Sequence, residues 1–288
     1  STSTAGFVGM AERGPVVGTP EFITSFADYQ RKSGGYLSEP THGATRFLPY
    51  AVEQFFANGG ARCFVMRVAP SDAKAARAVL GSVTMTAKNP GRWGNSIRVV
   101  VTPASKGKSQ AVAVTEDAAG GKTYTLKNAS VFSEGDVVAL SESGRVVGYN
   151  RVDRVQDNDV VFADEFEQEI VDTALVPRRV LSTCEVNIEV LCGDIDEVYE
   201  NVSLAEGSAD CITNRLSRSA LVAVSVAGVP DALPPIAAIT GDDADRKTVF
   251  TLDGGSDGSC KLADDSVYIG GGDAPRKRTG LAAVGEVD

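Results

Sequence analysis

Residues 47–68 constrain the fold of this chain more than any other stretch. Their first half carries apolar side chains at helical spacing: Phe47, Leu48, Ala51, Val52, Phe55 and Phe56. Pro49 falls in the first turn, where its missing N–H costs little, and Asn58-Gly59-Gly60 ends the helix. The strand Cys63–Val68 is then apolar at nearly every position, as expected when both faces of a sheet are covered. A helix followed by a doubly covered strand predicts α/β packing.

The same rhythm extends over residues 1–103, which we predict to form an N-terminal α/β part. A short strand at Ala5–Gly9 comes first. Thr24 or Ser25 caps a helix that passes through Phe26, Tyr29 and Gln30 and closes at Gly34-Gly35. A third helix, capped by Ser71 or Asp72, is predicted to reach Leu80, and a strand follows at Ile97–Thr102.

The pattern changes at about residue 104, and residues 104–180 predict a β-rich insertion. Lys106–Ser109 and Asp117–Lys122 have the composition of turns. Short alternating segments lie between and beyond them, at 110–115, 123–127, 137–141, 145–155 and 159–163. Their regular spacing favours an all-β, barrel-like insertion.

Residues 181–288 predict a second α/β part. Cys184–Val190 alternates strictly, Ser208 can cap a helix through Ile212 and Leu216, and Leu221–Val226 is typical of a buried strand. Leu281–Val284 opens a helix that runs toward the last residue, from which we expect a chain truncated at its C-terminal end. The coarse prediction is a mixed α/β (α+β) chain interrupted by a β insertion.

Charge and cysteine content exclude several classes of function. The 288-residue chain has a formal net charge of −10, which opposes non-specific binding to nucleic acid or to anionic lipid. No apolar run approaches 18 residues, the length that spans a bilayer. An odd number of cysteines without Cys-x-x-Cys spacing argues against a disulfide framework or a zinc ribbon, so we expect reduced thiols. They are Cys63, Cys184, Cys192, Cys211 and Cys260.

Hydrolase chemistry would depend on the one histidine, His42. Serine and cysteine nucleophiles need a base of near-neutral pKa to accept their proton. No Gly-x-Ser-x-Gly elbow presents a serine, and a loop histidine before a helix is more often solvated or structural. We therefore predict that the chain has no catalytic residue and is not an enzyme.

Two glycine-rich segments depart from phosphate-binding motifs. Gly121-Lys122-Thr123 ends like a P-loop, but Glu116 occupies the first glycine position, where a carboxylate would repel phosphate. Gly270–Gly272 follows a predicted strand, but Pro275 stands at the third glycine of the dinucleotide pattern. Weak anion binding stays open at this second segment, and a hairpin turn is the interpretation of the first.

A calcium loop is the remaining motif, and the match fails at two positions. Asp253–Gly258, with Asp264 in the twelfth place, has Gly255 where a ligand belongs, and Asp264 is too short to chelate as glutamate does. We interpret the segment as a solvated loop and the acidic run Gly241–Asp245 as a surface loop. The sequence predicts no metal site and no cofactor site.

Several segments, in order along the chain, resemble the tail sheath proteins of contractile phages, R-type bacteriocins and phage-tail-like injection systems. The most recognisable is Asn89-Pro-Gly-Arg-Trp-Gly-Asn-Ser-Ile97, a turn in which Gly91 supplies a positive φ and Trp93 anchors the loop by packing. Residues 128–163 are similar only to the β insertions of long sheath variants. The other segments are Ser3–Pro15, Phe47–Val68, Tyr199–Leu204 with Ile212–Ser219, and Tyr268–Ala283.

The resemblance implies a structural subunit, with the sheath-type core of subtilisin-like topology that the family has. It implies hexameric rings stacked helically around an inner tail tube, with baseplate and terminator proteins as further partners, and contraction that drives the tube through a target membrane. It implies assembly in the bacterial cytoplasm into a phage tail or tail-like particle, without stable membrane insertion or nucleic-acid binding. If the resemblance holds, we expect both terminal arms and the C-terminal domain of the family to be missing from this chain.

Two other classes of function stay open from the sequence. One is a subtilisin-like hydrolase, which would require His42. The other is a surface-binding module carried by the β insertion, suggested by its separate composition.

Overall fold

The computed structural model describes residues 4–116, 122–162, 164, 166, 176, 178–203, 208–227, 247–260 and 265–285. It divides the chain into two units. Unit 1 contains residues 1–77, 86–97 and 252–288, and unit 2 contains residues 78–85 and 98–251. The predicted second α/β part, 181–288, therefore contributes to both units.

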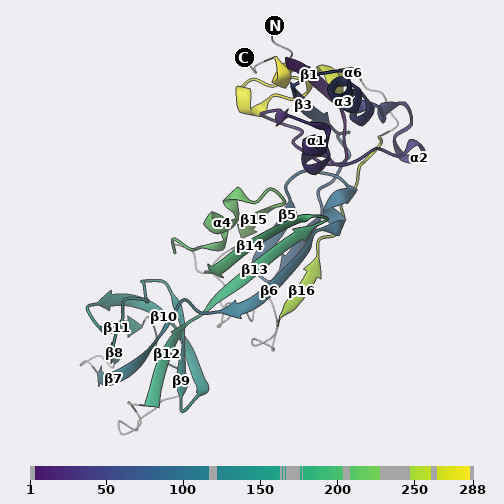
Figure 1. Ribbon diagram of the computed structural model, residues 1–288. Coiled ribbons are helices and arrows are strands. Elements are labelled where there is room, and N and C mark those ends of the chain that lie inside the picture. The colour runs from purple at the N-terminus through teal and green to yellow at the C-terminus, as the bar shows by residue number, and fades with distance from the viewer. Residues whose placement is uncertain are drawn as a thin grey trace. The chain divides into compact units, whose positions relative to one another are not determined.

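Unit 1 is built on a three-stranded sheet with β3 (Arg62–Val68) in the centre (Figure 1). β1 (Thr4–Met10) pairs with β3 in parallel, and β2 (Glu21–Ile23) pairs with its other edge in antiparallel fashion. α3 (Leu48–Ala57) packs on β1, and its buried Leu48 and Val52 share a core with Cys63 and Val65 of β3. The helix and strand predicted from residues 47–68 are thus confirmed.

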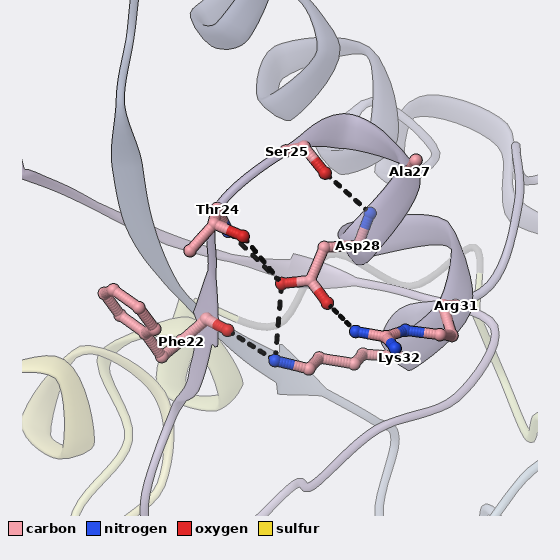
Figure 2. Close-up of a pocket in the computed structure, with 7 residues that line it drawn as sticks. All are labelled: Phe22, Thr24, Ser25, Ala27, Asp28, Arg31 and Lys32. Carbon is pink, nitrogen blue, oxygen red and sulfur yellow. Dashed lines mark hydrogen bonds and ion pairs between the residues drawn. The ribbon is translucent and has the colours of Figure 1, made fainter.

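α1 (Phe26–Ser33) begins where the sequence predicts. The Ser25 side chain accepts a hydrogen bond from the Asp28 amide at 3.0 Å, and the Asp28 carboxylate accepts one from the Thr24 amide at 3.2 Å (Figure 2). These reciprocal bonds satisfy backbone donors that a helix start leaves unpaired. Lys32 donates to the Phe22 carbonyl oxygen at 2.7 Å and fastens the helix to β2. Gly34 ends the helix with φ of 92°.

Short helices complete unit 1. α7 (Gly280–Val284) packs on both β1 and β3, so closely that a Cβ at Gly6 would lie 2.5 Å from Val284 Cγ1. α2 (Glu39–His42) precedes α3, and α6 (Asp265–Ile269) packs against α7. α6 occupies the place of the strand predicted before Gly270, so that prediction was wrong.

A four-stranded antiparallel sheet of unit 2 has the order β14-β13-β6-β16. β6 (Arg98–Ala104) and β13 (Glu185–Cys192) are its central strands and carry its most buried side chains, as their sequences predict. β14 (Ile195–Val202) and β16 (Thr248–Thr251) form the edges and were not predicted. A separate sheet has the order β15-β5-β4 and consists of β4 (Arg77–Leu80), β5 (Val83–Ala87) and β15 (Val222–Val226).

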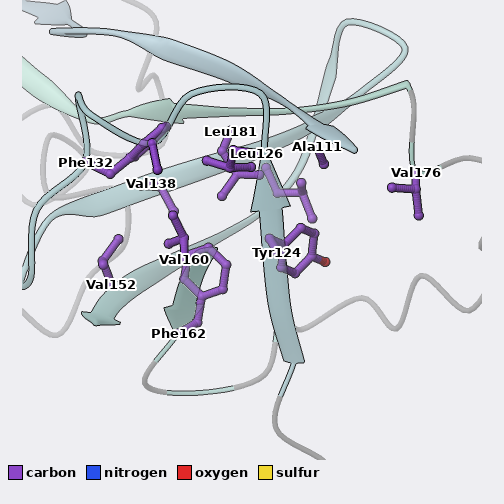
Figure 3. Packing of buried hydrophobic residues seen from close by; sticks show 12 residues of the cluster. Ala111, Tyr124, Leu126, Phe132, Val138, Val152, Val160, Phe162, Val176 and Leu181 are labelled. Carbon is purple, nitrogen blue, oxygen red and sulfur yellow. The ribbon is translucent and has the colours of Figure 1, made fainter. Parts of the chain in front are cut away.

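The β insertion is a closed barrel, with the strand order β10-β11-β8-β7-β12-β9. Five of its strands match the predicted segments, and the sixth, β12, adds to them. Their bounds are β7 (Lys108–Glu116), β8 (Lys122–Leu126), β9 (Val137–Glu142), β10 (Arg145–Gln156), β11 (Asp159–Phe162) and β12 (Arg179–Thr183). Figure 3 shows the apolar side chains that fill it, with Phe162 edge-on to Tyr124 at 5.5 Å between ring centroids. Closure leaves the barrel no free strand edge.

The helix predicted from Ser71 or Asp72 to Leu80 is wrong. Residues rich in alanine favour a helix, but here the backbone has a better partner in an extended form. Lys74 and Arg77 pair with Ser256 and Asp253 as antiparallel bridges, and the Asp72 carboxylate accepts hydrogen bonds from Ser259 instead of capping a helix. Tertiary pairing overrides local propensity in this stretch.

Two predictions in residues 208–226 are confirmed only in part. α4 (Ile212–Arg215) is a single turn that starts after Cys211, because the Ser208 hydroxyl accepts from the Asp210 amide and forms a local turn instead of a cap. β15 begins at Val222 and lies at a sheet edge with only that residue buried, so the buried strand expected at Leu221–Val226 is half exposed.

The observed class is mixed α+β and rich in strands. β1 and β3 run parallel, whereas the β2–β3 pair, the four-stranded sheet and the neighbouring strands of the barrel are antiparallel. The subtilisin-like topology that the family resemblance implied is not confirmed.

The register of β6 and β13 yields a test of the predicted insertion boundaries. Ala104 and Glu185 are direct partners in this ladder, so the chain leaves and re-enters the sheet at neighbouring positions. Replacing residues 105–184 with Asn-Gly should therefore join β6 and β13 as a hairpin. We expect the shortened chain to keep a cooperative unfolding transition, measured by circular dichroism. Loss of that transition would contradict an independent insertion.

Candidate functional site

Arg67 is the buried charge around which the loops of unit 1 are arranged. The side chain is 3% exposed, on β3, yet it hydrogen-bonds to two loops. Its Nε donates to the Ala11 carbonyl oxygen at 2.8 Å and its Nη1 to the Pro90 carbonyl oxygen at 2.6 Å. Burial lowers the pKa of Arg67 to about 10, opposed by the negative charge of Asp257. Arg67 thereby fixes the loop that follows β1 and the loop at 89–97 to the central strand.

The 89–97 loop is bound on its other side to residues 253–260. The Asn95 side chain donates to the Gly255 carbonyl oxygen at 3.0 Å and accepts from the Gly255 amide at 2.7 Å. The Arg92 amide donates to Asp257 Oδ1 at 2.9 Å. A segment that we interpreted as a solvated loop is therefore a structural part of unit 1, and that prediction is corrected.

Gly91 and Trp93 behave as the sequence predicts. Gly91 has φ of 136°, a conformation that side chains avoid, and its amide donates to the Lys74 carbonyl oxygen at 3.0 Å. Trp93 is 7% exposed and packs into the loop as its anchor. We name residues 89–97, 253–260 and Arg67 the loop junction.

A polar pocket of about 280 Å³ opens beside the loop junction. Its lining combines aromatic rings with both signs of charge: Glu12, Tyr36, Leu37, Ser38, Thr41, His42, Arg92, Trp93 and Asp257. His42 lies at the end of α2 and is 8% exposed, so it is buried and not the solvated loop residue of one interpretation. Burial lowers the pKa of His42, which favours a neutral imidazole, although nearby Asp257 acts in the opposite direction.

The pocket lacks the arrangement that hydrolysis requires. In the described part of the chain, no hydrogen bond joins the His42 imidazole to a serine, threonine or cysteine side chain, and the Thr45 hydroxyl donates to the His42 carbonyl oxygen at 2.7 Å instead. Cys260 is buried, and burial raises the pKa of its thiol, which opposes the nucleophilic thiolate. Among the described residues, no hydroxyl or thiol is therefore paired with the His42 imidazole as nucleophile and base.

The other motifs have equally plain outcomes. Within the described ranges, no three side chains of histidine, cysteine, aspartate or glutamate gather as a metal site. Gly270 and Gly272 approach the backbone of Thr279 and Lys277, so their close contacts are internal. All five cysteines are free, as predicted. Residues 117–121, 241–245 and 264, which include Gly121 and Asp264, lie outside the described residues.

A second depression on unit 1 lies at the start of α1. The depression of Figure 2 contains Asp28, but that carboxylate is already bonded to Thr24, Arg31 and Lys32. These bonds stabilise the helix start and leave few free polar atoms for a ligand.

Across the residues that the structure describes, no helix has the length and apolar character needed to cross a bilayer.

An exposed aromatic surface lies on the same unit and was missed from the sequence. Tyr36, Phe47 and Tyr50 are 46%, 53% and 41% exposed. Their rings touch in series, with centroids 4.7 Å apart for Tyr36–Tyr50 and 6.3 Å apart for Phe47–Tyr50, and Phe26 adds to Tyr36 at 5.7 Å. The Arg46 guanidinium lies 4.4 Å from the Phe47 ring centroid. We name Tyr36, Phe47, Tyr50 and Arg46 the aromatic surface.

Aromatic and arginine side chains in contact with one another and with solvent are typical of protein interfaces. From the sequence, Phe47 was assigned to the buried apolar stripe of α3, and its exposure in the structure corrects that assignment. Tyr50 lies outside the stripe, and this position was the available signal of an exposed aromatic residue.

Comparison with known proteins finds similarity to solved structures. No protein-family model matches the chain, and a search of curated proteins finds no significant match. Several solved structures match, and two of them are sheath tail proteins. One is from Desulfitobacterium hafniense, with 12% identity, a TM-score of 0.37 and coverage of 93% of this chain and 38% of that protein. The other is from Listeria innocua, with 20% identity, a TM-score of 0.25 and coverage of 67% and 34%.

The chain therefore spans between a third and two fifths of the length of either protein. Both proteins are of the family that the sequence segments resemble, the tail sheath proteins.

Proposed function

We propose that this chain is part of a structural tail sheath subunit that works by association with copies of itself. In the finer form of the proposal, the subunits form hexameric rings stacked around an inner tube, with baseplate and terminator proteins at the ends. The assembled sheath contracts and drives the tube through a target membrane. Assembly takes place in the bacterial cytoplasm, and the product is a phage tail or a tail-like particle.

The observation that carries the proposal is the way four of the resembling segments meet in unit 1. They lie far apart in the sequence, at 3–15, 47–68, 89–97 and 268–283. β1 of the first pairs along its whole length with β3 of the second, and Arg67 of β3 bonds Pro90 of the third. α7, within the fourth, packs on both strands. Segments that resemble one family thus build one folded core together.

The aromatic surface supports a role in association. Three exposed aromatic side chains in mutual contact bury a large apolar area at small cost in side-chain entropy when a partner covers them. The partner that the proposal supplies is another copy of the chain.

The direct test is electron microscopy of the full-length protein at increasing concentration. We expect tubes or sheath-like polymers with a repeated subunit. Protein that stays monomeric at every concentration would count against the proposal, and turnover of an ester or peptide substrate that is lost in His42→Ala would favour a hydrolase.

Substitution of the aromatic surface gives a sharper version of this test. Phe47→Ser with Tyr50→Gln removes two exposed rings, and serine is a favourable residue at the start of α3. We expect the concentration needed for assembly to rise about tenfold or more, since residues of this kind dominate interface energies. Sedimentation measures it.

The matched control is Ile269→Ser, which removes an equally exposed apolar side chain (61%) elsewhere on unit 1. This variant should assemble as the wild type does. Equal effects of the two changes would mean that general surface polarity, and not the aromatic surface, governs assembly.

A further inference from the structure

The chain enters and leaves the insertion barrel through two short crossings that lie side by side. Residues 105–107 connect β6 to β7, and Cys184 connects β12 to β13. The Thr183 amide donates to the Gly107 carbonyl oxygen at 3.0 Å, and the Gly107 amide donates to Thr183 Oγ1 at 3.2 Å. A third segment joins them where the Cys184 amide donates to the Val137 carbonyl oxygen at 2.9 Å.

Three charged side chains meet at these crossings. Lys106 Nζ lies 2.7 Å from Asp136 Oδ2 and 3.9 Å from Glu185 Oε1. Glu185 Oε2 also accepts from the Lys106 amide at 2.8 Å, and Asp136 Oδ2 accepts from the Ser133 amide at 2.7 Å. The first crossing, the first residue of β13 and the loop before β9 thus contribute one charged residue each.

If both carboxylates are ionised, the cluster contains two negative charges and one positive charge. Asp136 is 1% exposed and Glu185 is 4% exposed, while one lysine serves both carboxylates. Asp136 Oδ1 is buried and has no hydrogen-bond partner among the described residues. Two buried carboxylates that share one cation cannot both ionise at the ordinary cost, because burial and mutual repulsion disfavour the second charge.

The surroundings of Glu185 favour this side chain as the carboxyl group that holds the proton. Burial is the largest influence and raises the pKa of Glu185, and the charge of Asp136 raises it further. Thr183, the Lys106 amide and the Lys106 ammonium act in the opposite direction without cancelling burial. The neighbouring Cys184 thiol is neutral, since burial raises its pKa to about 12.

We propose that the Lys106–Asp136–Glu185 cluster binds one proton in the folded protein and loosens the two crossings into the barrel when that proton is lost. With the proton bound, the cluster is a neutral set of one lysine, one carboxylate and one carboxylic acid. Without it, an unpaired negative charge is buried between the crossings, and opening to solvent relieves it.

The direction of the pH effect follows from linkage. The pKa of Glu185 is raised in the folded state above its ordinary value of 4.5. The stability that the proton contributes is therefore fully present below pH 4.5 and is lost as the pH rises through the folded pKa. The crossings are tightest below pH 4.5 and loosen as the pH rises above that value.

Hydrogen exchange at the Lys106 and Cys184 amides of the full chain, followed from about pH 4 to about pH 9 so that it starts below the ordinary pKa of glutamate, tests the proposal. In the wild type, the opening constant should increase with pH, by up to about tenfold per pH unit after correction for base-catalysed exchange. Glu185→Gln keeps an acceptor for the Lys106 amide and cannot ionise, so its opening constant should not change with pH.

Glu189→Gln is the matched control, because it removes one charge from the same strand outside the cluster. It should retain the wild-type pH dependence. The same pH dependence in the wild type and in Glu185→Gln would overturn the proposal, as would opening that becomes rarer at high pH.

A measurement on the unmodified chain guards against a variant that does not fold. The carboxyl carbon of Glu185, followed by nuclear magnetic resonance, should titrate above pH 4.5. Titration at or below that value would overturn the proposal whatever the variants do. The hydrogen-exchange and titration results are independent of whether the protein assembles.

Discussion

Arg67→Met is expected to destabilise the protein by about 3 kcal/mol or more. Methionine fills much of the space of the arginine stem but donates no hydrogen bond, so the Ala11 and Pro90 carbonyl oxygens lose their donors. Each buried polar group left without a partner costs roughly 1–3 kcal/mol. The sum is a large share of the ~5–15 kcal/mol that stabilises a typical protein.

Urea unfolding followed by Trp93 fluorescence measures this loss, since Trp93 is the only tryptophan and belongs to the loop junction. Arg67→Lys keeps the charge but has one donor group in place of a planar fork, so its loss should be smaller. Arg31→Met, at an exposed α1 residue, should change stability by less than about 1 kcal/mol. A loss for Arg67→Met as small as for Arg31→Met would refute the central role of Arg67.

Gly255→Ala is expected to cost about 2–3 kcal/mol, although alanine is the smallest possible addition. A Cβ at Gly255 would lie 2.5 Å from the Gly91 carbonyl oxygen and 2.8 Å from Asn95 Oδ1. The first is a backbone atom, so the two loops must separate, and the pair of hydrogen bonds between Asn95 and Gly255 weakens.

The neighbouring Gly254 separates this crowding from the ordinary cost of removing a glycine. Gly254 has φ of 79° and no atom within 4 Å of a Cβ, so Gly254→Ala should cost only about 1–2 kcal/mol of backbone strain. Urea unfolding of the two variants compares them directly. A cost at Gly255 no greater than at Gly254 would show that the loops do not approach as closely as described.

The elements predicted correctly are those whose signals are local. The stripe of α3, the Ser25 cap of α1 and the alternation of β13 each lie within about ten residues. Five of the six barrel strands were also predicted, because turn residues and alternation mark each of them, whereas β12 was not. What the sequence could not supply was their order around the barrel, which depends on pairing between distant segments.

The errors come from contacts over long sequence separations. Residues 71–80 have helical composition, but their backbone pairs with residues 253–256, which composition cannot reveal. The same loop was interpreted as solvated because glycine and aspartate are common in exposed turns. Arg67 was read simply as part of an apolar strand, so its partners in two loops came only with the structure.

The pairing of Ala104 with Glu185 also makes this position a natural graft point for foreign cargo. Antiparallel partners have Cα atoms only about 5 Å apart, so any guest protein whose own ends lie close together could replace the barrel. Because the entropy cost of a longer connection grows slowly, the size of the guest matters less than the spacing of its ends. A repeated array of such subunits would then display one guest per subunit, such as a fluorescent label or an enzyme.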